Sequence, residues 1–301
     1  MVNMLSVTVL TFAEQPTEPA QPQGGAGTYE FACWLHAQGD AYRAITEFKR
    51  YEFEQRAKPA EAARGAFAAA ACYQLAQEWE RALRAYQYYG AAYPGAERAS
   101  ESVYRLIECL FGLQKFVEVE QAAAEFGKGH SATEFADDAA FLSALSRLMR
   151  RDWVAAATAF QAMDTTHLDS PLLPAARRLH DASELLQAMP RKSPQKAVLL
   201  SGIFPGTGQA YAGRKKDGWA AFLFNAALGY LTYDRFDRHD NKAAIPLLLL
   251  TSSFYAGNVY GAGNAAVAEN RRREETTVEQ VMADLGKEIA ETLGHPALLR
   301  P

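Results

Sequence analysis

The sequence predicts an all-α protein, with an array of helical hairpins followed by a small helical domain embedded in a membrane. Three observations predict this fold class. Residues 28–190 are rich in helix-forming Ala, Glu, Arg, Leu and Gln and poor in β-branched runs. Similar segments recur in this region at intervals of 37 or 38 residues. After Pro190 the composition changes, and two long segments contain no charged residue.

The N-terminal residues 1–13 are expected to be a signal peptide. Met4–Ala13 form a short apolar run that ends in Thr-Phe-Ala and is followed by polar residues. No Lys or Arg precedes the run, so the basic segment typical of such peptides is missing, and an unrelated apolar tail is the alternative. Residues 14–27 are rich in Pro, Gly and Gln and are predicted to be a flexible linker.

Four segments of residues 28–190 share a pattern that predicts closely packed helix pairs. In each segment a polar turn leads to an aromatic or small residue, and another small residue follows three positions later. Three of the four segments have a bulky residue after four more positions. A small side chain lets two helices cross closely, and the bulky one fills the groove beside it. The residues predicted to pack the repeats are Ala44, Phe48, Trp79, Ala82, Tyr86, Phe116, Trp153, Ala156 and Phe160.

This pattern resembles the tetratricopeptide repeat family, in which small residues lie at the helix crossing and a Pro closes the repeat. The second repeat matches best, with Ala82, Tyr86 and Pro94. The third repeat departs from the pattern, because Val119 and Ala123 stand where Ala and an aromatic residue are expected. The resemblance implies an α-solenoid, residues 28–190, whose concave surface binds a protein partner without a cofactor.

Four residues of the second repeat are the candidate partner groove: Arg84, Tyr88, Tyr89 and Tyr93. Tyr and Arg are favoured at binding hot spots. The alternative is that these aromatic residues pack in the core or against loops, because residues so close on one helix cannot all face the same way.

Two segments after Pro190 predict that residues 191–273 insert into a membrane as a helical hairpin. Residues 219–233 and 243–268 contain no charge, and the second segment is long enough to cross about 30 Å of hydrocarbon. Gly257 and Gly261 form a GxxxG pattern, which is typical of helix packing in lipid. We expect contact with the lipid bilayer through residues 197–268, and a buried soluble hairpin is the alternative.

A motif rich in Gly and aromatic residues opens this domain, since residues 201–214 are SGIFPGTGQAYAGR. It resembles the PGxGQxYxGR motif of a family of uncharacterised bacterial membrane proteins, and residues 257–260 and 270–271 resemble that family's GNxY and NR elements. Members often carry an exported tetratricopeptide array before this domain. The resemblance implies an architecture in the bacterial envelope and no activity. The motif residues of the membrane domain are Pro205, Gly206, Gly208, Gln209, Tyr211, Gly213, Asn225, Gly257, Asn258, Tyr260, Gly261 and Asn270.

Basic clusters at 214–216 and 271–273 flank the apolar segments and bear on the membrane topology. Two crossings put both clusters on the side of the repeats, which the positive-inside tendency then places in the cytoplasm. A third crossing, by residues 197–212, puts the repeats outside, in agreement with a signal peptide. This segment is short and broken, so a re-entrant course is the alternative. We expect an inner-membrane protein with periplasmic repeats, with cytoplasmic repeats as the alternative. Residues 274–301 are expected to form an amphipathic helix that docks on the repeats or lies on the membrane.

The sequence carries no pattern typical of a catalytic, metal or cofactor site. The three cysteines, Cys33, Cys72 and Cys109, recur near the repeat period and are interpreted as small apolar core residues. The six histidines form no HExxH pattern. The glycines of 205–213 lack the preceding strand and the GK[ST] sequence of a phosphate-binding loop. A net charge of −4 argues against a nucleic-acid partner.

These observations predict a membrane-anchored, non-enzymatic scaffold whose repeats bind another protein of the bacterial envelope. The alternative is that the membrane domain acts as an oligomeric assembly or a small-solute pore, with the repeats as a regulatory module. Asn225, Asn258 and Asn264 motivate this alternative, which includes a homo-oligomer, because polar groups in lipid face partners or a cavity. A wholly soluble helical protein is a third interpretation.

Overall fold

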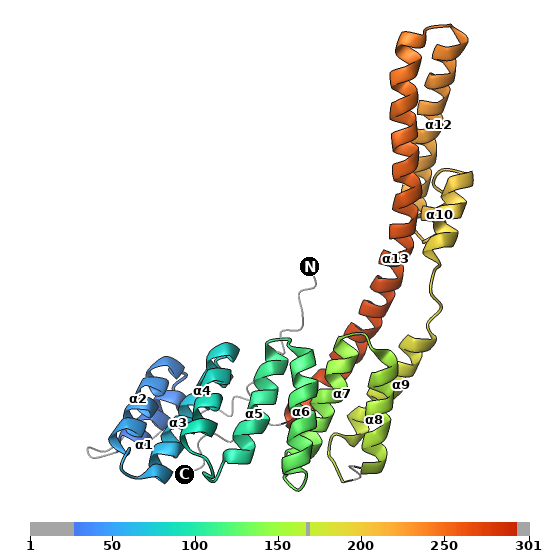
Figure 1. Cartoon of the computed structure of the whole chain (residues 1–301). Coiled ribbons are helices and arrows are strands. Elements are labelled where there is room, and N and C mark those ends of the chain that lie inside the picture. Colours follow the sequence, from blue (N-terminus) through green and yellow to red (C-terminus); the bar gives the residue numbers. More distant parts are fainter. Residues whose placement is uncertain (1–26, 167–168, 294–301) are drawn as a thin grey trace. The chain divides into compact units, whose positions relative to one another are not determined.

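The computed structural model describes residues 27–166 and 169–293, which form helices and contain no strand (Figure 1). The predicted all-α fold class is confirmed. The predicted signal peptide and nearly all of the predicted linker lie outside the described residues.

Contacts within the chain divide it into two units. The repeat unit comprises residues 1–187 and 283–301, and the hairpin unit comprises residues 188–282. Each unit has its own core, and each is described by itself below.

The repeat unit is built from consecutive helices, and from α1 to α8 each packs on the next. Hydrogen bonds from Arg177 and His180 join α9 to α8. In addition α5 contacts α7, so the first helices of neighbouring hairpins pack together, as in a solenoid. The helices are α1 (Thr28–Ala37), α2 (Ala41–Glu54), α3 (Pro59–Leu75), α4 (Trp79–Ala92), α5 (Ala99–Gly112), α6 (Phe116–His130), α7 (Ala136–Met149), α8 (Trp153–Thr166) and α9 (Leu173–Ala188).

One turn geometry closes all four hairpins from α1–α2 to α7–α8. The second residue after each first helix is left-handed: Gly39, Gln77, Gln114 and Arg151 have φ between 58° and 79°. The next backbone N–H bonds the carbonyl five residues back, as from Asp40 to Leu35. This pairing is the Schellman motif, which satisfies the free carbonyls at a helix end. The four hairpins therefore share a turn although only the first has glycine at the left-handed position.

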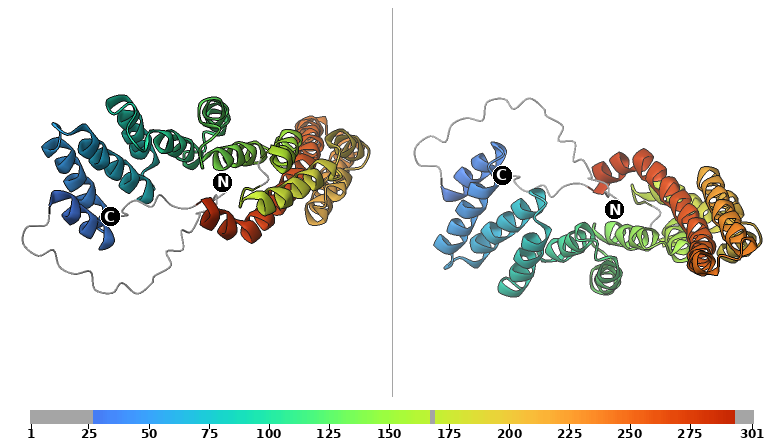
Figure 2. Two further views of the ribbon diagram at one scale, coloured as in Figure 1. Left: turned by 90° about the horizontal axis from the view of Figure 1, so that it is seen from below. Right: turned by 90° about the horizontal axis from the view of Figure 1, so that it is seen from above.

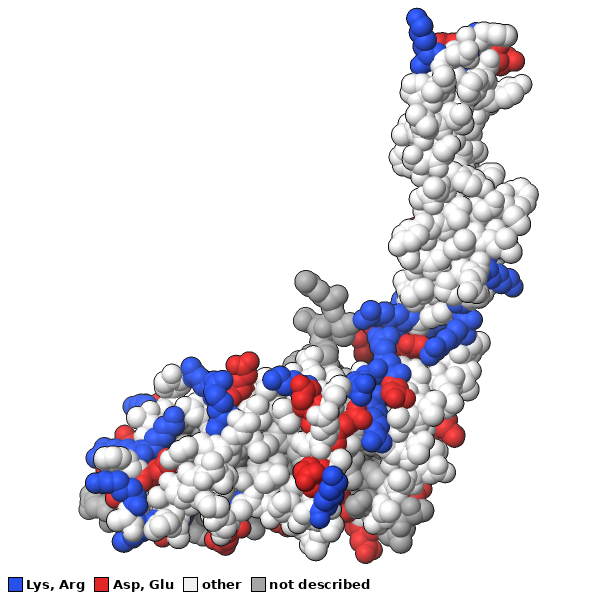
Figure 3. All heavy atoms as spheres, viewed as in Figure 1, with Lys and Arg blue, Asp and Glu red and all other residues white. Residues whose placement is uncertain are grey.

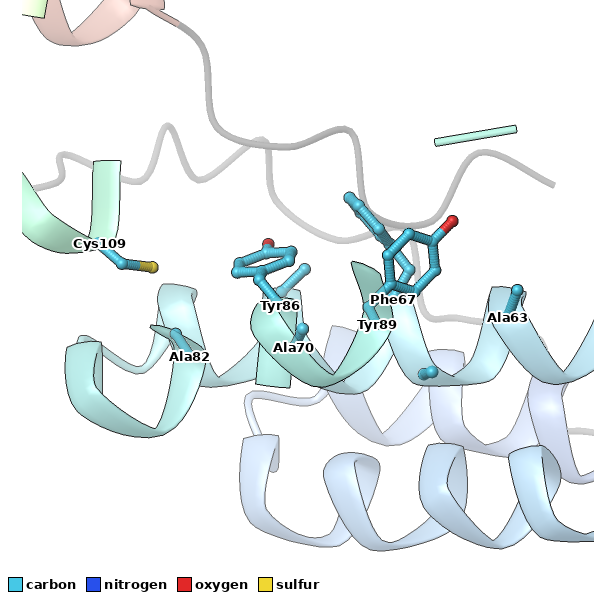
Figure 4. Close-up of a cluster of buried hydrophobic side chains, with 9 residues drawn as sticks. Ala63, Phe67, Ala70, Ala82, Tyr86, Tyr89 and Cys109 are labelled. Carbon is cyan, nitrogen blue, oxygen red and sulfur yellow. The ribbon is translucent and has the colours of Figure 1, made fainter. Parts of the chain in front are cut away.

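The residues predicted to pack the repeats lie between the paired helices. The small residues Ala44, Ala82 and Ala156 are fully buried, and the bulky Phe48, Tyr86 and Phe160 are buried beside them. Trp153 is buried, whereas Trp79 and Phe116 are half-buried. The Trp79 ring lies against Gly112, where a Cβ atom would come within 2.5 Å of it. Figure 4 shows one such cluster, with Phe67 and Tyr86 from α3 and α4 beside Cys109 of α5.

The hairpin unit consists of α10 (Pro194–Ile203), α11 (Thr207–Tyr211), α12 (Lys215–Asp237) and most of α13 (Asn241–Leu293). Gly206, with φ of 88°, interrupts the helical backbone between α10 and α11. A Cβ atom there would lie 1.9 Å from the carbonyl oxygen of Gly218, so only glycine fits. A hydrogen bond of 2.9 Å between Thr232 and Thr251 joins α12 to α13.

The chain turns back within residues 197–212, the segment to which the topology with periplasmic repeats assigns a third crossing. The segment begins and ends at the same end of the hairpin unit, because Lys192 Nζ donates to the carbonyl oxygen of Tyr211 at 2.6 Å. The backbone of Lys192 also exchanges two hydrogen bonds with the Asn270 side chain. The break at Pro205-Gly206 turns the chain back after α10, which at 10 residues is about 15 Å long and too short to span a bilayer.

The C-terminal helix predicted to begin at residue 274 is the end of α13, which continues without a break to Leu293. Ion pairs one turn apart explain this continuity. Glu269 pairs with Arg272 and Arg273, and Arg271 pairs with Glu275. Such pairs stabilise a helix across a stretch that has no apolar face of its own.

Candidate functional site

The four residues of the candidate partner groove do not share one surface. Tyr89 is buried with Phe67 in the core (Figure 4), because it lies one turn after Tyr86 on the same helix face. Tyr88 and Tyr93 both donate to Glu52 Oε1 at 2.7 Å, which ties α4 to α2. Arg84 is exposed. Packing within the array therefore accounts for Tyr89, whereas Tyr88 remains 53% exposed.

A buried polar network, which the sequence reasoning missed, joins the second and third hairpins. The Arg105 side chain is buried and donates to Glu101 and Glu108 on its own helix. Glu108 also accepts a hydrogen bond from Gln74, which in turn accepts one from Tyr86. The spacing of Glu101 and Glu108, four before and three after Arg105, is the signal that pattern analysis could have used. A buried charge of this kind is tolerated because its donors are paired.

Asp138, at the start of α7, carries the most perturbed carboxyl group of the repeat unit. Its pKa is raised to about 7, mainly by burial and in smaller part by the nearby charges of Glu108 and Asp137. The carboxyl group is therefore partly protonated near neutral pH. It touches no group with the geometry of a catalytic pair, and we assign it a role in stability.

The end of α13 packs on the repeat unit. Leu285 and Ile289 are buried, and Leu293 packs against a cluster formed by α5, α6 and α7. Arg178 of α9 forms an ion pair with Glu288 at 3.3 Å. In both views of Figure 2 the end of α13, in red, runs beside the green helices. Part of the array's surface is therefore covered by an amphipathic helix with apolar residues at i, i+4 and i+8.

The hairpin unit has an unusual distribution of side chains. Within residues 188–282, all of which the structure describes, alanine is the only buried hydrophobic residue type. The other buried side chains are polar: Ser201, Gln209, Asn225 and Thr232. Most of the large apolar and aromatic residues are exposed, including Trp219, Leu223, Phe224, Tyr230, Leu231, Tyr233, Leu248, Leu249, Leu250, Phe254 and Tyr260.

One helix of the described part, α13, is long and apolar enough to cross a membrane by length and composition. Only 11% of its most apolar stretch is buried, which sets it apart from the core helix of a soluble protein. Figure 3 shows a surface without charged residues along this unit, between charged groups at its two ends.

The two ends of the hairpin unit carry different charges. The α12–α13 turn, residues 234–242, has three acidic residues and three Lys or Arg. The opposite end carries the basic residues Lys192, Lys196, Arg214, Lys215, Lys216, Arg271, Arg272 and Arg273, with Asp217 and Glu269 among them. Lys192 and Lys196 lie over the Tyr211 ring, at 5.1 and 5.3 Å from its centre.

The glycines of this unit allow the backbones of neighbouring helices to come into direct contact. A Cβ atom at Gly208 would lie 2.1 Å from the carbonyl oxygen of Ala197, and one at Gly218 would lie 2.5 Å from that of Gly206. Gly213, with φ of 96°, makes the turn into α12. Pro205 is half-buried beside this contact. The motif residues Pro205 to Gly213 therefore hold α10 and α11 against α12 and α13.

A chain of hydrogen bonds runs from α10 to α13 through Gln209. Ser201 Oγ accepts from the Gly208 N–H at 3.0 Å and donates to Gln209 Oε1 at 2.9 Å. Gln209 Nε2 then donates to the carbonyl oxygen of Asn258 at 2.9 Å and to its Oδ1 at 2.8 Å. These hydrogen bonds identify which terminal atom of each amide group is the nitrogen donor and which is the oxygen acceptor.

Gln209, Asn225 and Asn258 line a groove of about 370 Å³, together with Ala221, Phe224, Ser253, Phe254 and Gly257. Two buried amide atoms at this groove, Asn225 Oδ1 and Asn258 Nδ2, have no hydrogen-bond partner among the described residues. Tyr260 is exposed and Gly261 half-buried one turn further along α13. This groove is the candidate functional site of the hairpin unit.

No group of three or more His, Cys, Asp or Glu side chains that could hold a metal ion occurs among the residues that the structure describes. Burial raises the pKa of the Cys72 and Cys109 thiols to about 12, which makes both poor nucleophiles. Neither thiol has the environment of a reactive cysteine.

The chain matches no protein-family model, and no curated protein matches it. Neither of the two family resemblances is therefore supported by a relative. What stands is the architecture: repeated helical hairpins, followed by a helix that is apolar and long enough to cross a membrane.

Proposed function

We propose that this protein is a membrane-anchored, non-enzymatic scaffold of the bacterial envelope. The hairpin unit inserts into the bilayer, and the repeat unit binds a protein partner. The observation that carries the proposal is the reversed burial in the hairpin unit, where alanine and polar side chains are inside and large apolar ones outside.

Water is a poor solvent for such a surface. A large apolar side chain loses about 1.5–3 kcal/mol when it is left in water rather than buried, and the hairpin unit exposes more than ten of them. Soluble monomers rarely expose apolar patches above a few hundred Å². In lipid the same surface is at no disadvantage, and small or polar residues are what helices bury against one another there.

The longer charge-free segment is long enough to cross a bilayer, and the shorter one is marginal and needs Asp217 or Asp234 near the interface. Residues 243–268 of α13 are about 39 Å long as a helix, against a hydrocarbon thickness of about 30 Å. In α12 the charge-free residues 218–233 are about 24 Å long. Trp219 and Tyr233 lie at the two ends of this stretch and are exposed, as interfacial aromatic residues are.

Two crossings, by α12 and α13, account for the hairpin unit, with α10 and α11 as a segment that enters and returns on one side. The basic end then faces the cytoplasm by the positive-inside tendency. Because the hairpin unit begins at residue 188, next to Lys192, the repeats lie on this side too. The arrangement favours cytoplasmic repeats over the periplasmic location expected from the apolar N-terminal run.

The repeat unit supplies the partner surface. Its own covering helix, the end of α13, indicates the kind of segment that it accepts: an amphipathic helix with apolar residues at spacing four, such as Leu285, Ile289 and Leu293. A partner helix of this pattern would bind to the array beside or in place of that segment.

Carbonate extraction of membranes, combined with protease treatment of spheroplasts, tests the proposal. We expect the full chain to stay in the membrane at high pH, and the repeats to be cleaved only after lysis. Release by carbonate would overturn the membrane anchor. Cleavage in intact spheroplasts would instead place the repeats in the periplasm and leave the anchor standing.

A second candidate function, an assembly formed by the membrane domain itself, is favoured by one observation. The two unpaired amide atoms at the groove lie in the part of the chain proposed to be in lipid, where polar groups generally face partners or a cavity.

A further inference from the structure

The glycines of the hairpin unit fall into two groups. At Gly206, Gly208 and Gly218 an added Cβ atom would lie within 2.5 Å of a backbone atom, so packing inside the chain requires glycine. At Gly257 an added Cβ atom would meet nothing within 4 Å. At Gly261 it would meet only Gln209 Nε2, at 3.9 Å. Among the described residues, packing therefore does not require glycine at either position of the GxxxG pattern of α13.

The groove beside Gly257 offers one acceptor and one donor. Asn225 uses its Nδ2 to bond the carbonyl oxygen of Ala221 at 2.8 Å, which leaves Oδ1 as the acceptor. Asn258 uses its Oδ1 to accept from Gln209, which leaves Nδ2 as the donor. Asn225 is 8% exposed, so neither water nor lipid solvates its amide freely. An unpaired buried polar group destabilises the monomer, because it has lost its hydrogen bonds to water without gaining others.

The two asparagines lie at the same level of the hairpin. Thr232 and Thr251 face each other across the antiparallel pair at 2.9 Å. Asn225 lies seven residues before Thr232, and Asn258 lies seven residues after Thr251, so both are two turns from that contact. The groove therefore holds a buried acceptor and a buried donor at one level of the hairpin, next to Gly257 and Gly261 of α13.

We propose that this face binds a second copy of the chain, and that the hairpin units form a two-fold symmetric dimer in the membrane. The proposal rests on the membrane insertion proposed above. A two-fold interface requires a surface complementary to itself. An acceptor on α12 and a donor on α13 meet this requirement when the two amide side chains turn toward the groove, because Asn225 of each copy can then pair with Asn258 of the other. The groove lining carries no charge, and its small residues Ala221, Ser253 and Gly257 allow close helix approach.

Dimerisation would give the scaffold two repeat units on one side of the membrane. Two linked binding sites raise the apparent affinity for a partner that is itself dimeric or clustered, by about 10²–10⁴-fold when the geometry permits both to bind. The partner would then be recognised by avidity as well as by the contacts of one array.

The test measures the oligomeric state of the full chain in detergent micelles over a range of protein-to-detergent ratios. The variants are Gly257→Leu, which fills the open ridge, and Asn225→Leu, which removes the unpaired acceptor. Gly202→Leu is the matched control, because Gly202 is an exposed helical glycine with nothing within 4 Å of an added Cβ atom and lies outside the groove lining.

We expect the wild type and Gly202→Leu to be dimers, and Gly257→Leu and Asn225→Leu to dissociate at least 10-fold more readily, with unchanged helix content. A monomeric wild type, or variants that dimerise as the wild type does, would overturn the proposal. A monomer that carries a bound lipid in native mass spectrometry, lost in Asn225→Leu, would also overturn it and assign the groove to an amphiphile. Carbonate extraction of the same variants reports separately on membrane insertion.

Discussion

In the repeat unit the largest side chains are the most buried, whereas in the hairpin unit the largest side chains are the most exposed. Phe48, Tyr86 and Phe160 are buried in the array. Trp219 and Tyr260 of the hairpin unit are about two-thirds exposed or more. Both units are helical and rich in alanine, so helix propensity does not distinguish them. The difference shows that the type of side chain buried between the helices, and not helix propensity, indicates the environment that each unit suits.

The two units also bury different polar groups. The repeat unit buries a charged residue, Arg105, and surrounds it with carboxylates. The hairpin unit buries neutral amides and a serine, and links them through Gln209. A buried ion pair is tolerated in a unit that water surrounds. In lipid a charge is far more costly, so neutral hydrogen bonds are better suited there.

Removal of a large buried side chain is expected to have the largest effect. Phe160→Ala should destabilise the repeat unit by about 3–5 kcal/mol, because it leaves a cavity between α7 and α8. Tyr260→Ala in the hairpin unit should change stability by less than about 1 kcal/mol, since that ring is 71% exposed. Denaturant unfolding of the detergent-solubilised chain measures both. Equal losses in the two variants would remove the contrast between the units.

The second largest effect on stability is expected when alanine replaces a tightly packed glycine of the hairpin unit. Gly206→Ala is expected to destabilise the hairpin unit by about 2–3 kcal/mol, because the new Cβ atom would meet the Gly218 carbonyl and the φ of 88° suits glycine alone. Gly257→Ala should leave the monomer unchanged within about 0.5 kcal/mol. Thermal unfolding followed by protease resistance of the hairpin unit distinguishes the two. Tolerance of Gly206→Ala would show that the α10–α12 contact is looser than described.

The pKa of Asp138 predicts a pH effect in the repeat unit. Its folded pKa is raised from 3.8 to about 7, mainly by burial and then by Glu108. Between these values the folded state binds more protons than the unfolded state, so this group lowers stability as pH rises from 4 to 7. Asp138→Asn should therefore stabilise the protein by about 1 kcal/mol at pH 8, allowing for partial exposure, and have no effect near pH 3.5. A larger effect at the acidic end would contradict this assignment.

The smallest effect is expected at the repeated turns. Gln77→Gly should stabilise the second hairpin by about 0.5–1 kcal/mol, since Gln77 has a φ of 58° that glycine adopts without strain. Gly39→Ala should destabilise the first hairpin by a similar amount, although no atom lies near the added methyl group. Unfolding midpoints of the two variants give the comparison. If Gln77→Gly destabilises the protein, side-chain contacts of Gln77 outweigh its backbone strain.

Pattern analysis could predict the elements that depend on neighbours in the chain. The recurring small residues Ala44, Ala82 and Ala156 lie at helix crossings, as their spacing indicates. It could not separate Tyr88 from Tyr89 as surface and core, because the relevant contacts, with Glu52 and Phe67, come from other helices. It also placed the start of a separate helix at residue 274, where ion pairs one turn apart continue α13.

The sequence by itself determined the helical class, the repeat interval, the small and bulky packing positions and the charge-free segments of this protein. All of these are properties of residues within a few turns of one another, where helix geometry relates spacing to direction. Only the tertiary structure decided that residues 197–212 return to their starting end, and that Asn225 and Asn258 stand at one level with one free atom each. The pairing of distant helices depends on hairpin register and on which hydrogen bonds are already used, and neither is contained in local spacing.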